Sequence, residues 1–69
     1  MAVKEPIQEH AVYSREEVAD LLGVSLSTIK RLITTGQLEA SKPNGVRRVF
    51  IQGSSIMRML DQSRVEYGR

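Results

Sequence analysis

The sequence predicts a mainly α-helical domain with a small β-hairpin, in the order helix, turn, helix, two-stranded hairpin, C-terminal helix. Two observations lead to this prediction. Two short helical patterns are separated only by Gly23-Val24-Ser25, a spacing typical of a helix-turn-helix. A β-rich run with a Pro-Asn-Gly turn and a third apolar helical pattern then follow.

The first helix is expected from Arg15 to Leu22, because both of its ends carry capping signals. Ser14 is a preferred N-cap residue, and Glu17 three positions later completes a capping box. Gly23 is the residue type expected just past a helix end, where the backbone turns left-handed.

The second helix is expected to begin after Ser25, its predicted N-cap, and to end at Gly36. At about 100° per residue, one face of this helix is an apolar stripe that contains Leu26, Ile29, Leu32 and Ile33. The opposite face is polar and follows the spacing i, i+3, i+4, i+7: Ser27, Lys30, Arg31 and Thr34. Two interpretations of this face are open, an ordinary solvated surface and a surface that binds a polyanion.

The hairpin is expected to join strands at 38–41 and 46–51 around the turn Pro43-Asn44-Gly45. Strand alternation places Val49 and Ile51 on one face, and Arg48 and Phe50 on the other. Cations gather near the turn: Lys42, Arg47 and Arg48. Charges that keep an edge hairpin from aggregating would explain them, and so would a loop that grips a phosphate backbone.

The third helix is expected after Gly53, which is predicted to break the preceding strand. Ser54 or Ser55 is the predicted cap, and the helix is predicted to run to about Glu66. Its buried side is expected to carry Ile56, Met59 and Leu60. Residues 1–12, with Pro6 and no clear periodicity, are predicted to form a flexible arm, and residues 13–67 the folded domain.

The charge of the chain is unevenly distributed. Its net charge is +2 at pH 7, but residues 1–20 hold two basic and five acidic residues, whereas residues 21–69 hold eight basic and three acidic ones. A basic lobe favours a polyanionic partner. Nucleic acid is favoured over a membrane, because no basic helix with a wide apolar face is present.

Several function classes receive no support from the residues. The chain has no cysteine, and its single histidine, His10, lies in the predicted arm without a catalytic or metal-ligating partner. No phosphate-binding glycine motif occurs. We therefore expect no enzyme activity, metal site, cofactor or membrane partner. Residues 1–12 lack the apolar core of a secretory signal, so a cytoplasmic location is expected.

The stretch from Tyr13 to Leu60, YSREEVADLLGVSLSTIKRLITTGQLEASKPNGVRRVFIQGSSIMRML, resembles the excisionase-type winged helix-turn-helix domain of the MerR-like superfamily. The similar features are the aromatic-Ser-x-x-Glu start, the ADLLGVS-x-STI and RLI-x-x-G-x-L segments, and the Arg-Arg wing that leads into Val-x-Ile. The resemblance covers 48 of the 69 residues.

This resemblance implies a protein that binds double-stranded DNA through two elements. The second helix would enter the major groove, and its candidate contacts are Ser25, Ser27, Thr28, Lys30, Arg31 and Thr34. The hairpin would act as a wing on an adjacent minor groove, and its candidate contacts are Lys42, Asn44, Arg47 and Arg48.

The resemblance also implies an architectural role in site-specific recombination. Excisionases, also called recombination directionality factors, are typical of bacteriophages and mobile elements. Several copies bind head to tail near an attachment site, bend the DNA, and bias an integrase toward excision. A small transcriptional regulator with the same fold is the nearest alternative, although no heptad-bearing dimerisation helix follows residue 60. A protein-interaction adaptor that binds an acidic surface is the alternative from another class.

Two positions depart from the family pattern. Position 26 is often polar in the family, and here Leu26 could pack on the core or contact a thymine methyl group. Phe50 replaces a residue that is often polar or basic. Together with Met57 and Met59 it is a candidate for self-association, and contacts within the monomer explain the three residues as well.

Overall fold

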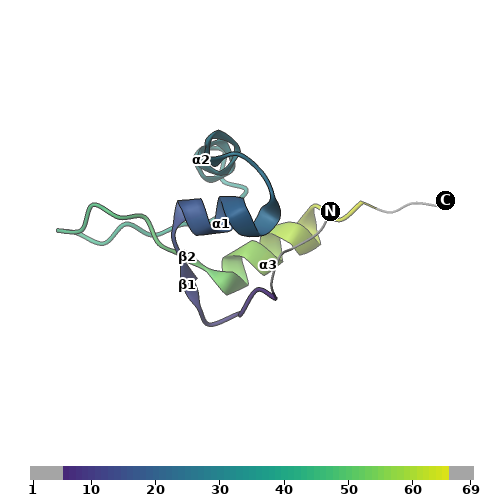
Figure 1. The fold of residues 1–69 in the computed structure, drawn as a ribbon, viewed down its shortest axis with the longest axis horizontal. Coiled ribbons are helices and arrows are strands. Elements are labelled where there is room, and N and C mark those ends of the chain that lie inside the picture. Colours follow the sequence, from purple (N-terminus) through teal and green to yellow (C-terminus); the bar gives the residue numbers. More distant parts are fainter. Residues whose placement is uncertain (1–5, 66–69) are drawn as a thin grey trace.

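A computed structural model describes residues 6–65 of the chain. The elements along the chain are β1 (Val12–Tyr13), α1 (Arg15–Leu22), α2 (Leu26–Thr34), β2 (Ile51–Gln52) and α3 (Gly53–Gln62). In Figure 1, α1 lies between α2 and α3, and the segment between α2 and β2 projects sideways as a long wing. The predicted fold class, a mainly helical winged helix-turn-helix, is confirmed.

α1 has the predicted bounds, and its start is held by the predicted capping box. The Glu17 backbone N–H donates to Ser14 Oγ at 3.0 Å, and the Ser14 backbone N–H donates to Glu17 Oε1 at 2.7 Å. These two bonds satisfy donors that a helix N-terminus otherwise leaves unpaired. The local sequence therefore determines where α1 begins.

The turn between α1 and α2 is formed by Gly23 in the left-handed conformation, with φ 69°. The amides of Gly23 and Val24 donate to the carbonyl oxygens of Asp20 and Ala19, at 3.3 and 3.0 Å. This pair of bonds is the Schellman arrangement that ends a helix. Ser25 then caps α2, because its Oγ accepts from the Thr28 amide at 3.1 Å. The two helices are consequently held at a fixed angle by a three-residue turn.

α2 ends as predicted at a glycine. Thr35 is the last residue with helical backbone angles, and Gly36 follows with φ 83°. The Gln37 amide reaches back to the Leu32 carbonyl oxygen at 2.9 Å. The chain therefore leaves α2 abruptly, and Leu38 is brought back into the core, where its side chain is buried.

The wing has less β-structure than the sequence predicts. Within residues 38–50, strand pairing is confined to one antiparallel bridge, Ser41 with Phe50, whose two backbone bonds measure 2.8 and 2.7 Å. A turn at Asn44-Gly45 closes the tip, with φ 81° at Gly45. An isolated two-stranded hairpin is only marginally stable in water, which agrees with pairing at the base of the wing alone.

The two-stranded sheet pairs segments that no pattern in the sequence connects. β1 and β2 are antiparallel, with Val12 opposite Gln52 and Tyr13 opposite Ile51. Residues 6–11, assigned to the arm, lie against the same region: Ile7 packs on the core, and the amides of Gly53 and Ser54 donate to the carbonyl oxygens of Ala11 and Glu9. Residues 1–5 lie outside the described residues.

α3 begins and ends earlier than predicted. Its N-cap is Gln52, which makes no side-chain capping bond, so neither Ser54 nor Ser55 has the predicted role. The strand ends just before Gly53, as predicted, but Gly53 is already the first residue of α3. A Cβ atom there would overlap the carbonyl oxygen of Gln8, so the close approach of residues 8–9 requires glycine. The predicted end near Glu66 lies outside the described residues, and α3 ends at Gln62.

The core is small and draws on every helix. Its fully buried side chains are Val18, Ile29, Leu38, Ile51 and Ile56, each at most 1% exposed. α1 supplies three further buried residues, and the expected contributions of Met59 and Leu60 from α3 are confirmed. Among the described helices, none combines the length and apolar character needed to cross a membrane.

Candidate nucleic-acid interface

The polar face of α2 is turned to solvent by the packing of its apolar face. Ile29 is completely buried, and Leu32 and Ile33 pack partly buried against the core. A helix anchored on this side must present the opposite side outward. That side forms the α2 ridge, four exposed residues in a row along the helix: Ser27, Lys30, Arg31 and Thr34.

The hydroxyl groups at both ends of α2 are partly occupied by the helix itself. Ser25 Oγ lies 2.9 Å from Thr28 Oγ1 and accepts the Thr28 amide, so both side chains serve the N-terminal cap. Thr34 Oγ1 donates to the Lys30 carbonyl oxygen at 2.9 Å. Ser27 is the ridge hydroxyl without such a bond to any described residue. Of the candidate hydroxyls, Ser27 is thus the most readily available as a donor to a phosphate.

The cations of the ridge are available to an external partner. Neither Lys30 nor Arg31 forms an ion pair with a residue in the described range 6–65. The ion pair found among these residues joins other positions, Arg58 of α3 and Glu39, at 3.3 Å. Unpaired cations projecting from a helix face suit contacts with phosphates and base edges.

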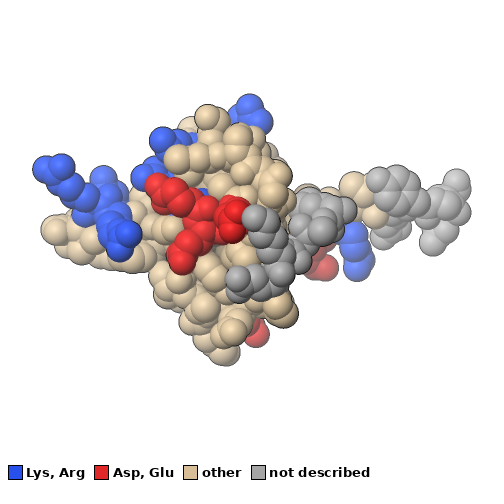
Figure 2. Space-filling view, viewed as in Figure 1, with Lys and Arg blue, Asp and Glu red and all other residues tan. Residues whose placement is uncertain are grey.

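The candidate wing residues are all exposed. Asn44 lies in the turn at the tip, and Lys42, Arg47 and Arg48 lie on the two arms of the wing. Within residues 6–65 none of these three cations has an ion-pair partner. Figure 2 shows basic side chains over the projecting wing and near α2, whereas acidic side chains gather in the middle of this view, over α1. In this view the basic side chains of the wing and near α2 therefore lie beside an acidic patch over α1.

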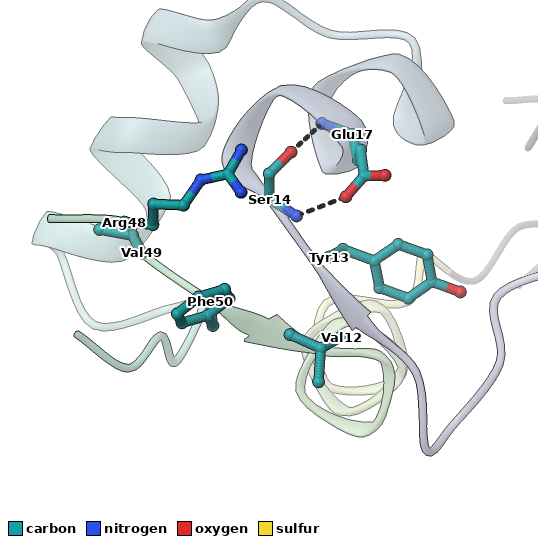
Figure 3. Close-up of a pocket in the computed structure, with 7 residues that line it drawn as sticks. All are labelled: Val12, Tyr13, Ser14, Glu17, Arg48, Val49 and Phe50. Atoms are coloured by element: carbon teal, nitrogen blue, oxygen red, sulfur yellow. Dashed lines mark hydrogen bonds between the residues drawn. The ribbon is translucent and has the colours of Figure 1, made fainter. Parts of the chain in front are cut away.

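Beside the base of the wing, a groove of about 490 Å³ is lined by Val12, Tyr13, Ser14, Glu17, Arg48, Val49 and Phe50. Figure 3 shows Arg48 extending from the wing toward the start of α1, with the ring of Phe50 on the wing strand below it. Phe50 is half-buried and lies outside the hydrophobic core cluster. It is therefore an accessible aromatic group at the wing base.

The other two candidates for self-association, Met57 and Met59, differ in how much of each side chain is exposed. Met57 is 44% exposed on α3, whereas Met59 is 7% exposed and belongs to the core cluster. Burial removes Met59 from any surface that could contact a second copy. Leu26 is half-buried and is not part of the hydrophobic cluster, so the side chain stands at the margin between core and ridge.

The fold also brings one cation to the wing that spacing along the sequence left unassigned. Arg15, at the first position of α1, lines a hollow together with Arg47 and Arg48. The sequence holds no local signal for this meeting, because Arg15 and Arg47 are 32 positions apart. Among the described residues no group of three potential metal ligands occurs.

Comparison with known protein families agrees with the fold. A family model described as a helix-turn-helix domain matches residues 12–64, which include every helix and strand described above. No curated protein and no solved structure matches the chain significantly.

Proposed function

Because the chain belongs to the helix-turn-helix domain family, and such domains bind DNA, we propose that α2 enters the major groove of double-stranded DNA while the wing contacts an adjacent minor groove. The proposed base-edge and phosphate contacts are Ser27, Lys30 and Arg31 on α2. Lys42, Asn44, Arg47 and Arg48 are the proposed wing contacts. Ser25, Thr28 and Thr34 assist chiefly by fixing the helix that carries the ridge.

The observation that carries this proposal is the unpaired cationic ridge. Lys30 and Arg31 are exposed, lack ion-pair partners among residues 6–65, and stand opposite a fully buried Ile29 that fixes the rotation of α2. An ordinary solvated helix face also carries exposed cations, but the position of these two beside a basic wing favours a polyanionic partner. The ridge and the wing together supply the positive surface that DNA binding requires.

The proposed biological role is that of an excisionase. In this role several copies bind neighbouring sites next to an attachment site, bend the DNA, and bias an integrase toward excision in the bacterial cytoplasm. The resemblance described above supports it, as do apolar side chains left exposed for contacts between neighbours, Val12 at 53% and Met57 at 44%. A single small module makes few contacts, so binding by several contacting copies would raise its affinity.

DNA binding is tested by replacing one ridge cation and one wing cation. Arg31→Ala and Arg47→Ala should each weaken binding to a DNA duplex roughly tenfold, the loss expected for one base or phosphate contact. Fluorescence anisotropy with a labelled duplex measures the effect. Arg58→Ala is the matched control, because it removes the same charge from α3 and should leave affinity unchanged. Undiminished binding by both test variants, with the fold intact, would instead favour an adaptor that binds protein.

The excisionase role is tested on a long DNA fragment that contains an attachment site. We expect stepwise retarded complexes in a gel-shift titration, with mobility shifts that depend on site position because the DNA is bent. Adding the integrase should then increase excision over integration. One saturable complex on the long fragment, at a single operator, would favour a transcriptional regulator.

A further inference from the structure

A hollow of about 180 Å³ lies at the base of the wing, where two distant segments of the chain meet. Its lining residues are Ser14, Arg15, Glu16, Arg47, Arg48 and Val49. Three of them are arginines, one from the first residue of α1 and two from the returning arm of the wing. Antiparallel pairing of β1 with β2 holds these segments together, since each segment adjoins one of the paired strands.

The arginines of this hollow are not neutralised within the described chain. None of the three forms an ion pair with a residue in the range 6–65, although Glu16 lines the same hollow. The neighbouring Glu17 carboxylate is engaged elsewhere, since it accepts the Ser14 amide at 2.7 Å. Figure 3 shows Arg48 reaching toward the start of α1 while the Glu17 carboxylate bonds to Ser14. The hollow thus carries a net positive charge, with three arginines and one glutamate in its lining.

The position of the hollow relates it to the two DNA-contacting elements. It lies between the start of α1 and the wing, and α1 packs directly against α2. A major groove and its adjacent minor groove are separated by one sugar-phosphate strand. A protein that places α2 in the first and the wing in the second must have that strand pass between the two elements. The arginine hollow is the basic surface that this intervening strand would meet.

We propose that Arg15, Arg47 and Arg48 together hold a backbone phosphate of double-stranded DNA in this hollow, with Arg15 as a contact that belongs to neither the ridge nor the wing. The inference rests on the proposed function, because it assumes that α2 lies in the major groove and the wing in the adjacent minor groove. Guanidinium groups offer planar pairs of N–H donors that match phosphate oxygens. A phosphate carries no base identity, so this contact adds affinity and register but no sequence preference.

The test replaces Arg15 with glutamine, which has a similar helix propensity and a shorter, uncharged side chain. Binding to several duplexes of different sequence is measured by anisotropy at a series of salt concentrations. Arg15→Gln should weaken binding roughly fivefold at about 0.1 M salt, equally for every duplex, and reduce the slope of log affinity against log salt by about 0.9. Arg58→Gln, with the same loss of charge on α3, should change neither quantity.

A second variant raises the positive charge of the same hollow, whereas Arg15→Gln lowers it. Glu16→Gln removes the carboxylate that lines the site and should strengthen binding about two- to threefold at low salt, again without sequence preference. Circular dichroism melting of each variant confirms that the fold is retained. Should Arg15→Gln fail to fold, the Glu16→Gln result decides alone, and unchanged affinity would overturn the proposal.

The failure of this inference can be distinguished from the failure of the proposed function. Full affinity and an unchanged salt slope for Arg15→Gln, beside a tenfold loss for Arg31→Ala, would remove the phosphate site and leave the DNA-binding mode intact. A loss in Arg15→Gln confined to particular sequences would also overturn it, because that result requires a base contact. If Arg31→Ala and Arg47→Ala both retain full affinity, the underlying docking mode is itself wrong.

Discussion

Leu26 opens α2 with an apolar side chain at the border between the core and the ridge. The sequence left two roles open for it, core packing and a thymine-methyl contact. The structure leaves the side chain half-buried and outside the hydrophobic cluster, whereas Ile29, one turn later, is fully buried. Both roles therefore stay open, because a side chain of intermediate exposure packs on its neighbours and still leaves part of its surface accessible.

Replacing Leu26 with serine separates the two roles. We expect the free energy of unfolding to fall by less than about 1 kcal/mol, because only part of the side chain is removed from water. We also expect an altered base preference at one position of the DNA site, through loss of the apolar contact with a thymine methyl group. Urea denaturation measures the first, and selection from a randomised duplex pool the second. A loss above about 2 kcal/mol would instead assign Leu26 to the core.

Individual side chains differ in how well the sequence predicts them. Helical periodicity correctly predicts which face of α2 is exposed, because burial of Ile29 follows from spacing alone. It does not reveal that the Thr34 hydroxyl donates a hydrogen bond to the Lys30 carbonyl oxygen, because threonine in a helix has more than one rotamer available. Nor could spacing reveal Arg15 beside Arg47, a proximity that exists only after the chain has folded.

At the scale of elements, the start of α1 depends on a pair of reciprocal hydrogen bonds. Ser14→Ala removes the acceptor of the Glu17 amide, and we expect it to lower the stability of the domain by about 1 kcal/mol. The corresponding fall in melting temperature is about 4–8 °C for a domain of this size. Thermal denaturation followed by circular dichroism measures it.

The matched control is Ser27→Ala, which makes the same chemical change at an exposed position inside α2. The Ser27 hydroxyl bonds to no described residue, and alanine favours helix, so its melting temperature should stay level or rise slightly. Equal destabilisation by the two changes would mean that the capping bond contributes nothing measurable.

Element boundaries are predictable where the signal is local. The bounds of α1 and the start of α2 match the prediction because their signals are local. Ser14 and Ser25 each accept the amide three residues later, and Gly23 ends α1 by donating its own amide to carbonyl oxygens of that helix. α3 was misplaced because its first turn has no side-chain cap, and its start is instead marked by backbone bonds from Gly53 and Ser54 to residues 9–11. The pairing of β1 with β2 joins segments about 40 positions apart, and two-residue strands leave no periodic pattern to detect.

At the scale of the whole molecule, the N-terminal segment 6–11 packs against the start of α3. Gly53→Ala tests this contact, because the added Cβ would overlap the Gln8 carbonyl oxygen. Alanine normally stabilises a helix relative to glycine by about 0.5–1 kcal/mol. Here we expect the opposite effect. The free energy of unfolding should fall by about 1–3 kcal/mol, because the added Cβ forces the segment away from α3. Urea denaturation measures the change.

The same substitution in a chain lacking residues 1–9 provides the comparison. With the Gln8 backbone absent, Gly53→Ala should become neutral or stabilising, although the shortened parent is itself less stable because Ile7 no longer packs on the core. An equal penalty in both chains would show that the overlap with Gln8 is not its cause.

Because few backbone amides of the wing are hydrogen-bonded, their hydrogens should exchange quickly with solvent. Between Ser41 and Phe50, the only described backbone bond besides their own bridge is that of the Val46 amide. The amides of Lys42, Asn44, Gly45, Arg47, Arg48 and Val49 have no acceptor within residues 6–65, so their deuterium uptake should approach the rate of an unstructured peptide while the core amides stay protected. Uptake at these six positions then serves as an internal gauge: slowing on addition of a ligand reports occupancy of the wing without any label attached to it.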